Sequence, residues 1–282
     1  MLFVVIPVYN RWQYTAACLD SLRRQTYSNF RVVVVSHGST DGTDEAIQQH
    51  YDWVILLKGN SDMWWAAAMN MGVQHALQMG ATHVLTLNND LQVNDNYLQS
   101  LITAATKNER SIVGSIGVNI AHPEQVTFAG IKWSSITAKY VSAIDLRTTY
   151  STIRDGYDTL PSDLLPGRGT FLPVTVFRDI GLFDENTFPH YGADDDFSLR
   201  ARKAGYALIV NVASVVYSHV NQAKQPGEKS YLKFVADAVL STRSPLKLGT
   251  RWKWARKHGA VPLLYFLFDL LRIGKSLIFK KR

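Results

Sequence analysis

The first 110 residues alternate short apolar runs with segments that have helical spacing of apolar residues. The apolar runs have the length of buried strands and are rich in β-branched residues, and they lie at 2–9, 31–35, 53–57 and 82–90. Helices are expected between them, from about Asp44 and over 65–79 among others. Strands that alternate with helices predict an α/β fold with a single doubly wound, mostly parallel sheet flanked by helices.

Polar residues follow three of these runs, at the points where the predicted strands end. They are Tyr9-Asn10, Ser36 to Ser39 and Asn88 to Asp90. Because ligands bind at the carboxyl ends of the strands in such sheets, we expect these segments to converge on one crevice. Residues 111–230 are expected to complete the same sheet and cover the crevice, and residues 231–282 to form a basic helical extension.

The net charge of +7 is concentrated near the C-terminus. Residues 243–282 contain eleven Lys or Arg and one acid, a local net of +10, so the first 242 residues, with 19 basic and 22 acidic side chains, carry −3. This distribution argues against a nucleic-acid-binding domain and favours attachment to an anionic surface. The single cysteine, Cys18, excludes an internal disulfide and gives no zinc-ligand spacing. Since residues 1–11 lack a signal-peptide pattern, we expect a cytoplasmic domain.

An apolar run at 260–271 lies inside this basic segment. It is too short to cross a bilayer, which needs about 20 residues. Basic residues flank it on both sides, over 251–257 and 272–282. We therefore predict an amphipathic helix that binds the inner face of the cell membrane, with a helix packed on its own domain or a partner subunit as the alternative. The domain is expected to fold without this segment.

Two acidic positions could carry chemistry. Asp90 ends the fourth run, where a carboxylate can hold a divalent cation against a diphosphate, although such a turn is more often a solvated loop. Asp194, Asp195 and Asp196 precede a predicted helix, where acids are ordinary capping residues. Three in a row exceed what capping needs, and their repulsion raises the pKa of at least one, as a general base requires.

Six segments together resemble glycosyltransferase family 2, the inverting enzymes of the GT-A fold. The resemblance covers about residues 3–220 and implies a nucleotide-binding half at 1–110 and an acceptor half at 111–230, before the tail at 231–282. It rests on VVIPVYNR at 4–11, CLDSLRRQTYSNFRVVVV at 18–35, GSTDGT at 38–43, LTLNND at 85–90, IGLFDE at 180–185 and DDDFSLRARKAGY at 194–206. The Asn-Asn-Asp variant is similar to bacterial rhamnosyltransferase-like members that build surface polysaccharides.

The resemblance implies a binding site for a nucleoside-diphosphate sugar. Ser36 stands where relatives usually carry a base-recognising Asp, which leaves the nucleotide open. Either Trp64 or Trp65 is free to stack on a sugar ring, or both pack against neighbouring elements. Arg168, in a glycine-containing loop, contacts phosphate or is simply exposed. The residues expected to bind the donor are Pro7, Tyr9, Asn10, Ser36, Asp41, Asn89, Trp65 and Arg168.

The same resemblance implies a metal and a catalytic base. Asp90 matches the last acid of the family's metal motif and would bind Mg²⁺ or Mn²⁺, whereas Asn88 replaces the first acid. His219 matches a histidine that many relatives place near the metal, and it equally fits a hydrogen-bonded core residue. Asp194 aligns best with the catalytic base, and Asp195 is the second candidate.

The implied reaction moves a sugar to a hydroxyl group of a glycan or lipid-linked acceptor, by one in-line displacement that inverts the anomeric centre. Departures from the family pattern at Ser36, Asn88 and Ala193 keep open a non-catalytic nucleotide-sugar or glycan-binding module on the same fold. A nucleotidyltransferase is a weaker alternative, because the chain lacks the glycine-rich, lysine-bearing opening that cradles a triphosphate.

Overall fold

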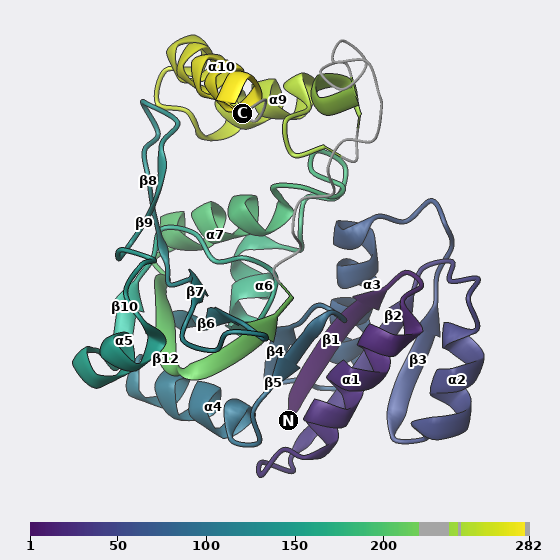
Figure 1. Ribbon diagram of the computed structural model, residues 1–282. Coiled ribbons are helices and arrows are strands. Elements are labelled where there is room, and N and C mark those ends of the chain that lie inside the picture. The colour runs from purple at the N-terminus through teal and green to yellow at the C-terminus, as the bar shows by residue number, and fades with distance from the viewer. Residues whose placement is uncertain (220–236, 242–243, 280–282) are drawn as a thin grey trace.

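The computed structural model describes residues 1–219, 237–241 and 244–279, which form an α/β domain followed by C-terminal helices (Figure 1). The strands are β1 (Leu2–Val8), β2 (Phe30–Ser36), β3 (Val54–Lys58), β4 (His83–Thr86), β5 (Leu91–Val93), β6 (Ser111–Asn119), β7 (Val126–Phe128), β8 (Ile131–Trp133), β9 (Tyr140–Ser142), β10 (Thr159–Pro161), β11 (Thr170–Pro173) and β12 (Ala207–Ser218). The helices are α1 (Trp12–Arg23), α2 (Thr43–His50), α3 (Trp65–Gln78), α4 (Tyr97–Lys107), α5 (Tyr150–Gly156), α6 (Val174–Ile180), α7 (Ala193–Lys203), α9 (Leu248–His258) and α10 (Pro262–Phe279).

One sheet runs through the whole domain, in the order β10-β12-β6-β11-β4-β1-β2-β3. The pairs β1/β2, β2/β3, β1/β4 and β6/β12 are parallel, whereas β11 is antiparallel to both of its neighbours, β4 and β6. Strands from both halves of the chain therefore share one sheet. The predicted fold class, a mostly parallel doubly wound α/β sheet flanked by helices, is confirmed.

The alternation of side chains along each strand divides the core into two layers. In β1, Phe3 and Val5 join a cluster that includes residues of α3, α6 and α7, while Val4 and Ile6 join a cluster with residues of α1, α2 and α4. Because both faces are covered, β1 reads as a continuous apolar run, as parallel sheets require. The four runs predicted as strands correspond to β1 to β4.

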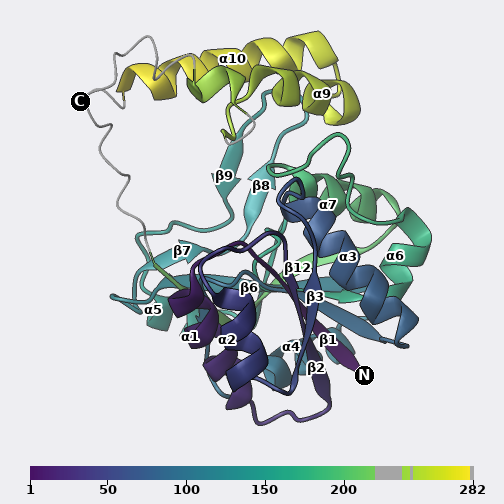
Figure 2. The same ribbon diagram turned by 90° about the vertical axis from the view of Figure 1, so that its right-hand side faces the viewer.

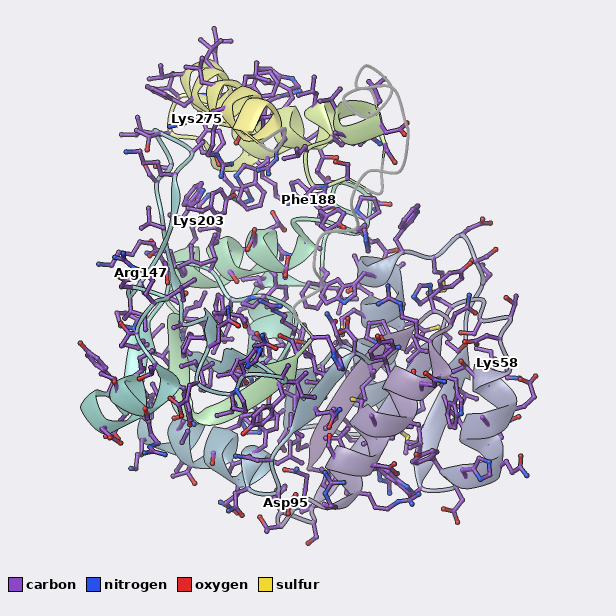
Figure 3. The ribbon with its side chains drawn as sticks, viewed as in Figure 1. Lys58, Asp95, Arg147, Phe188, Lys203 and Lys275 are labelled. Atoms are coloured by element: carbon purple, nitrogen blue, oxygen red, sulfur yellow. The ribbon has the colours of Figure 1, made fainter. Side chains whose placement is uncertain are left out.

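The C-terminal helices α9 and α10 lie on the far side of α7 from the sheet (Figures 1 and 2). Side chains fill the space between these ribbons, and Phe188 lies there with its ring 5.6 Å from that of Trp254 (Figure 3). Trp254, Tyr265 and Asp269 are buried. One face of α10, which contains most of the apolar run at 260–271, is therefore packed inward, as in the alternative prediction for that run.

The opposite face of α10 is exposed, and Leu271 has 71% of its surface accessible. Within the described residues no helix combines the length and the apolar character needed to cross a membrane. The parts of the predicted tail at 231–236, 242–243 and 280–282 lie outside the described residues.

Candidate functional site

The loops that follow β1 and β2 are tied together at the carboxyl edge of the sheet. The backbone N–H of Asn10 donates to Ser39 Oγ at 2.9 Å, and the backbone N–H of Thr40 donates to Asn10 Oδ1 at 2.8 Å. Asn10 and Arg11 have φ values of 57° and 66°, in the left-handed region, which turns the chain sharply into α1. Two of the segments expected to converge therefore meet in one hydrogen-bonded unit.

Asp41 and Ser36 have partners within this unit. The Asp41 carboxylate accepts hydrogen bonds from the backbone N–H of Trp12 at 3.3 Å and of Thr43 at 3.2 Å, at the starts of α1 and α2. Ser36 is buried, and its Oγ donates to Ser39 Oγ at 3.1 Å. Both side chains thus shape the loops, and a direct donor contact from either stays a prediction.

Tyr9 offers an open aromatic surface beside these loops. Tyr9 is 50% exposed, and the centre of its ring lies 5.6 Å from that of the His37 ring, on which it stacks. Burial lowers the pKa of His37, and its buried Nδ1 has no hydrogen-bond partner. Pro7 is buried in β1, in register with Val35 of β2, and its donor contact stays a prediction. The open aromatic face of Tyr9 suits stacking on a nucleobase.

The turn after β4 presents a carboxylate to the same edge. Asn88 Oδ1 accepts a hydrogen bond from Trp65 Nε1 at 3.1 Å, and Asn89 Nδ2 donates to Thr15 Oγ1 at 2.9 Å. Asp90, with 38% of its side chain exposed, lies 3.6 Å from the guanidinium of Arg11. Within this turn the two amides are used structurally, and Asp90 carries the negative charge.

His219 lies beside the first turn of α1, which follows Arg11, the residue that contacts Asp90. Its ring contacts Tyr14 at 5.2 Å, in the helical turn that follows Arg11. The described residues contain no group of three or more His, Cys, Asp or Glu side chains that could hold a metal ion. Mg²⁺ is commonly held by one or two carboxylates together with substrate phosphates. Asp90 therefore fits a cation that arrives with a diphosphate, and does not fit a cation held by protein ligands alone.

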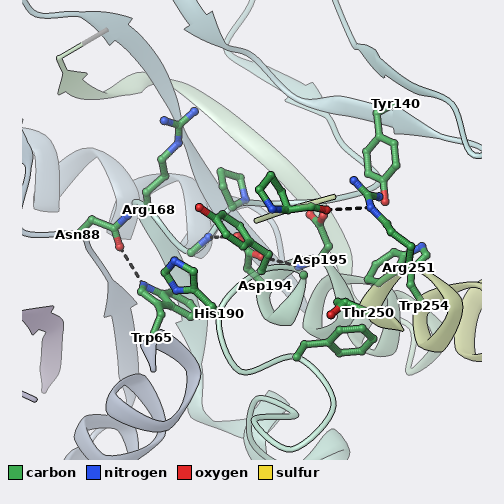
Figure 4. Close-up of a pocket in the computed structure, with 16 residues that line it drawn as sticks. Trp65, Asn88, Tyr140, Arg168, His190, Asp194, Asp195, Thr250, Arg251 and Trp254 are labelled. Carbon is green, nitrogen blue, oxygen red and sulfur yellow. Dashed lines mark hydrogen bonds between the residues drawn. The ribbon is translucent and has the colours of Figure 1, made fainter. Parts of the chain in front are cut away.

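A pocket of about 430 Å³ opens beside the turn after β4 (Figure 4). It reaches from the donor side to the C-terminal helices, so that segments far apart in sequence line it. Its lining includes Trp65, Asn88, Arg168, His190, Tyr191, Asp194 and Asp195 from the domain, Tyr140 from strand β9, and Pro245, Thr250, Arg251 and Trp254 from the C-terminal segment. Trp64 packs on His190 at 5.4 Å, whereas Trp65 faces the pocket.

Asp194 is held at the pocket by two backbone amides. Its Oδ2 accepts from Gly167 N–H at 2.9 Å and its Oδ1 from Asp195 N–H at 3.0 Å. A side chain on Gly167 would collide with the Trp65 ring, so the close approach requires glycine. Burial lowers the pKa of Arg168, and the charges of Asp194 and Asp90 act in the opposite direction. The Arg168 guanidinium is therefore within electrostatic range of both carboxylates.

The two acids that follow differ from Asp194 and from each other. Asp195 lines the pocket, and burial together with the charge of Asp194 raises its pKa well above the ordinary value. Asp196 is fully buried and bonds Arg200 at 2.8 Å and both Lys257 and His258 at 2.7 Å. Despite burial, these hydrogen bonds lower the pKa of Asp196 to about 2. Asp196 therefore anchors α9 on α7.

The sequence matches Glycosyl transferase family 2 over residues 3–151, which is more than half of the chain. The chain belongs to this family. Among proteins it resembles, Glycosyltransferase AglE from Haloferax volcanii is 27% identical over 210 residues, which are 73% of this chain and 62% of AglE. The chain thus spans less than two thirds of the length of this family relative.

Solved structures of related fold include GalNAc-T7 with UDP, GalNAc and Mn²⁺, at a TM-score of 0.66 and 15% identity, covering 95% of this chain and 54% of that one. A mannosyltransferase from Pyrobaculum calidifontis, in complex with GDP-Man and Mn²⁺, has a TM-score of 0.56 and 15% identity, covering 95% and 68%. Such low identities establish the fold alone, and it is the GT-A fold that the sequence resemblance implied.

The family motifs point to one side of this pocket, and the other side lacks such a signal. Tyr140, Thr250, Arg251 and Trp254 lie outside the segments that carried the resemblance, yet they face Asp195 across the pocket. Three of them belong to a basic, aromatic-containing tail, which predicts surface attachment as readily as a pocket wall. No pattern in the family 2 motifs could have selected them.

Proposed function

We propose that this protein transfers a sugar from a nucleoside-diphosphate sugar to a hydroxyl group of an acceptor, with inversion at the anomeric carbon. The observation that carries the proposal is the pocket in which Asp194 lies with Arg168 and the Asn88 turn. One continuous space thus joins the expected diphosphate site to a fixed carboxylate. Membership of glycosyl transferase family 2 supports this reaction class.

In the proposed step, Asp194 takes the proton of the acceptor hydroxyl as its oxygen attacks the anomeric carbon. The bond from that carbon to the diphosphate oxygen breaks, and the nucleoside diphosphate leaves with the electron pair. The two amides that hold Asp194 orient its carboxylate before substrate binds. Arg168 places positive charge within range of Asp90, where the leaving diphosphate would lie.

A divalent cation, Mg²⁺ or Mn²⁺, would neutralise charge on the departing diphosphate. Asp90 would hold it together with phosphate oxygens, and His219 remains a candidate ligand. Arg11 is the cation that contacts Asp90 in the structure, and donor binding would exchange this contact for the metal. Mn²⁺ in the named structures of GalNAc-T7 and the Pyrobaculum calidifontis mannosyltransferase supports a divalent cation.

Calorimetric titration of UDP, GDP and dTDP, each with Mn²⁺ and with EDTA, tests the donor site. We expect one nucleotide to bind more tightly with Mn²⁺, and Asp90→Ala to weaken that binding at least about tenfold, a loss of ~1.4 kcal/mol. Asp155→Ala, which removes an exposed carboxylate on α5, is the matched control. Absence of binding by all three nucleotides would reject the proposed donor class, and equal binding by Asp90→Ala would remove Asp90 from the site.

The exposed face of α10 supports a second part of the proposal, namely attachment to the anionic inner face of the cell membrane. This face carries Leu263, Leu264, Leu267, Phe268 and Leu271. Lys253 and Arg256, which are exposed on the neighbouring helix α9, add positive charge. Apolar side chains beside basic ones are typical of an interfacial helix, and a lipid-linked acceptor for surface polysaccharide synthesis fits this location.

A non-catalytic nucleotide-sugar-binding module is the second candidate. The contacts of Asn88 with Trp65 and of Asp90 with Arg11 favour it, since they occupy the turn that would hold the metal. Turnover separates the two candidates. Release of nucleoside diphosphate from a bound nucleotide sugar supports the transferase, whereas tight binding without release over hours supports the module.

A further inference from the structure

The C-terminal helix α9 forms a wall of the pocket that contains Asp194. Thr250, Arg251 and Trp254 lie on one face of α9 and line this pocket. Trp254 is four residues after Thr250 and three after Arg251, so it lies beside both on the helix surface. Tyr140, from strand β9, lines the same end (Figure 4). Figure 4 shows this wall on the opposite side of Asp194 from Asn88. An acceptor would approach Asp194 from the side of the wall.

The position of this wall is fixed by buried contacts. Lys257 and His258 at the end of α9 both bond Asp196 on α7, two residues from Asp194. Trp254 Nε1 donates to Tyr265 Oη at 2.9 Å and thereby joins α9 to α10. The spacing between the wall and Asp194 is therefore built into the fold.

The charges at this end of the pocket are compensated. Arg251 donates from Nε to the backbone carbonyl of Pro245 at 2.9 Å, and its Nη1 lies 3.6 Å from the buried Asp269. Asp195 has a raised pKa because of burial and the nearby Asp194, which favours a protonated carboxyl that can donate a hydrogen bond. Neither an unpaired anion nor an unpaired cation dominates this end of the pocket. Hydroxyl groups therefore suit both Asp195 and Arg251.

Aromatic rings supply the remaining surface. Tyr140, Tyr191 and Trp254 line the pocket, and its volume of about 430 Å³ lies within the range of small-molecule sites, which is roughly 300–1,000 Å³. The apolar C–H faces of a pyranose pack well on such rings, while its hydroxyl groups reach polar side chains at the edges.

We infer that α9 and Tyr140 form an acceptor subsite for an uncharged pyranose, whose ring packs on the aromatic wall and whose hydroxyl groups meet Asp195 and Arg251. This inference rests on the proposed transferase activity and deepens it. It makes the C-terminal segment part of the substrate-binding machinery, in addition to any role at a membrane.

Blocking the wall without touching the donor side tests the inference. Thr250→Trp would fill the pocket from α9, and Lys253→Trp, which places the same ring on an exposed position of the same helix, is the matched control. Tyr191→Ala, which removes a ring that is 40% exposed, provides a second variant that opens the pocket instead of filling it. The probes are the methyl glycosides of glucose, galactose, mannose, rhamnose and N-acetylglucosamine, measured by saturation-transfer NMR on protein saturated with its nucleoside diphosphate.

We expect at least one methyl glycoside to bind the wild type and Lys253→Trp equally, and to bind Thr250→Trp and Tyr191→Ala at least tenfold more weakly. The affinity for the nucleoside diphosphate should be the same in all four proteins, which shows that each is folded. Unchanged glycoside binding in Thr250→Trp, or no glycoside binding by a wild type that binds its nucleotide, would overturn the subsite. Failure to bind any nucleotide would instead reject the proposed function.

Discussion

The two sides of the pocket are built in different ways. The donor side consists of short loops after β1, β2 and β4, of which the turn after β4 reaches the pocket at Asn88. Hydrogen bonds between small polar side chains and backbone amides, such as that of Asn10 with Ser39, join the loops after β1 and β2. The opposite side is assembled from α7, Tyr140 of strand β9, and α9, and the buried charge of Asp196 joins α7 to α9. Local turns shape the first side, and long-range ionic contacts hold the second.

Helix α7 connects the two sides of the site. Asp194 and Asp196 are two residues apart on α7, so their side chains point in different directions. Asp194 faces the pocket and is held by amides, whereas Asp196 faces α9 and is enclosed by three basic side chains. A change at Asp196 should therefore disturb the acceptor side before the donor side.

The largest effect is expected from Asp196→Ala. Removing one partner of a buried ionic cluster costs about 3–5 kcal/mol, because the remaining charges stay buried without compensation. We expect a lower midpoint of thermal unfolding, followed by circular dichroism. Asp145→Ala, which removes an exposed carboxylate paired with Arg147, should cost less than about 1 kcal/mol. Equal losses in the two variants would contradict a special role for the Asp196 cluster.

The same cluster predicts a pH dependence of stability. The pKa of Asp196 is lowered from an ordinary value of 3.8 to about 2, so this carboxylate stabilises the folded state fully above about pH 4. The contribution, about 2 kcal/mol, should be lost as the pH falls from about 4 towards 2. Asp196→Ala should accordingly show a shallower loss of stability over this interval than the wild type.

Most of the sheet could be predicted from the sequence because its signals are local. β1 to β4 are apolar runs, the first three are each followed by a helix, and the turn residues that end the runs follow within a few positions. Two strands of the second half, β6 and β12, are also apolar runs, but their pairing and the antiparallel insertion of β11 depend on contacts between distant segments. A single sequence does not encode that order in any local pattern.

The candidate site could be predicted only in part, for the same physical reason. The acidic cluster at 194–196 stands out, yet the different environments of its members depend on Gly167, which contacts Asp194, and on Lys257 and His258, which contact Asp196. Those partners are 27 to 62 residues away in sequence. The charge of the tail predicts surface attachment, whereas its buried half, centred on Trp254, became visible only in the fold.

A prediction for catalysis sharpens the contrast on α7. We expect Asp194→Asn to lower turnover at least about a hundredfold, since an amide cannot accept the proton, while nucleotide affinity stays unchanged. Asp195→Asn keeps hydrogen-bonding capacity and should retain most of the turnover while raising KM for the acceptor. The measurement is nucleoside diphosphate release at saturating donor. The reverse pattern, loss in Asp195→Asn and retention in Asp194→Asn, would assign the base to Asp195.

The smallest effect per residue concerns the exposed surface of the C-terminal helices. This prediction compares the outer face of that segment with the face that lines the pocket. Each basic residue near an anionic bilayer contributes about 1 kcal/mol, so reversing Lys253 and Arg256 together to Glu should weaken binding to phosphatidylserine-containing vesicles at least about thirtyfold. Sedimentation at low and high salt would measure it, because salt screens these contacts. Lys107→Glu with Arg178→Glu, exposed on α4 and α6, makes the same change in net charge away from the tail and should leave binding nearly unchanged.

Nucleotide and methyl glycoside affinities should be the same in both double variants, since neither pair lines the pocket. Equal weakening by the two pairs would reduce the attraction to an effect of overall charge, and a wild type that does not sediment with anionic vesicles would exclude the membrane proposal. Either result would leave the pocket face intact, because Thr250, Arg251 and Trp254 are placed by contacts with α7 and α10 and not by the outer surface. The two faces of one helical segment can thus be tested independently, and binding of vesicles and of glycosides should respond to different substitutions.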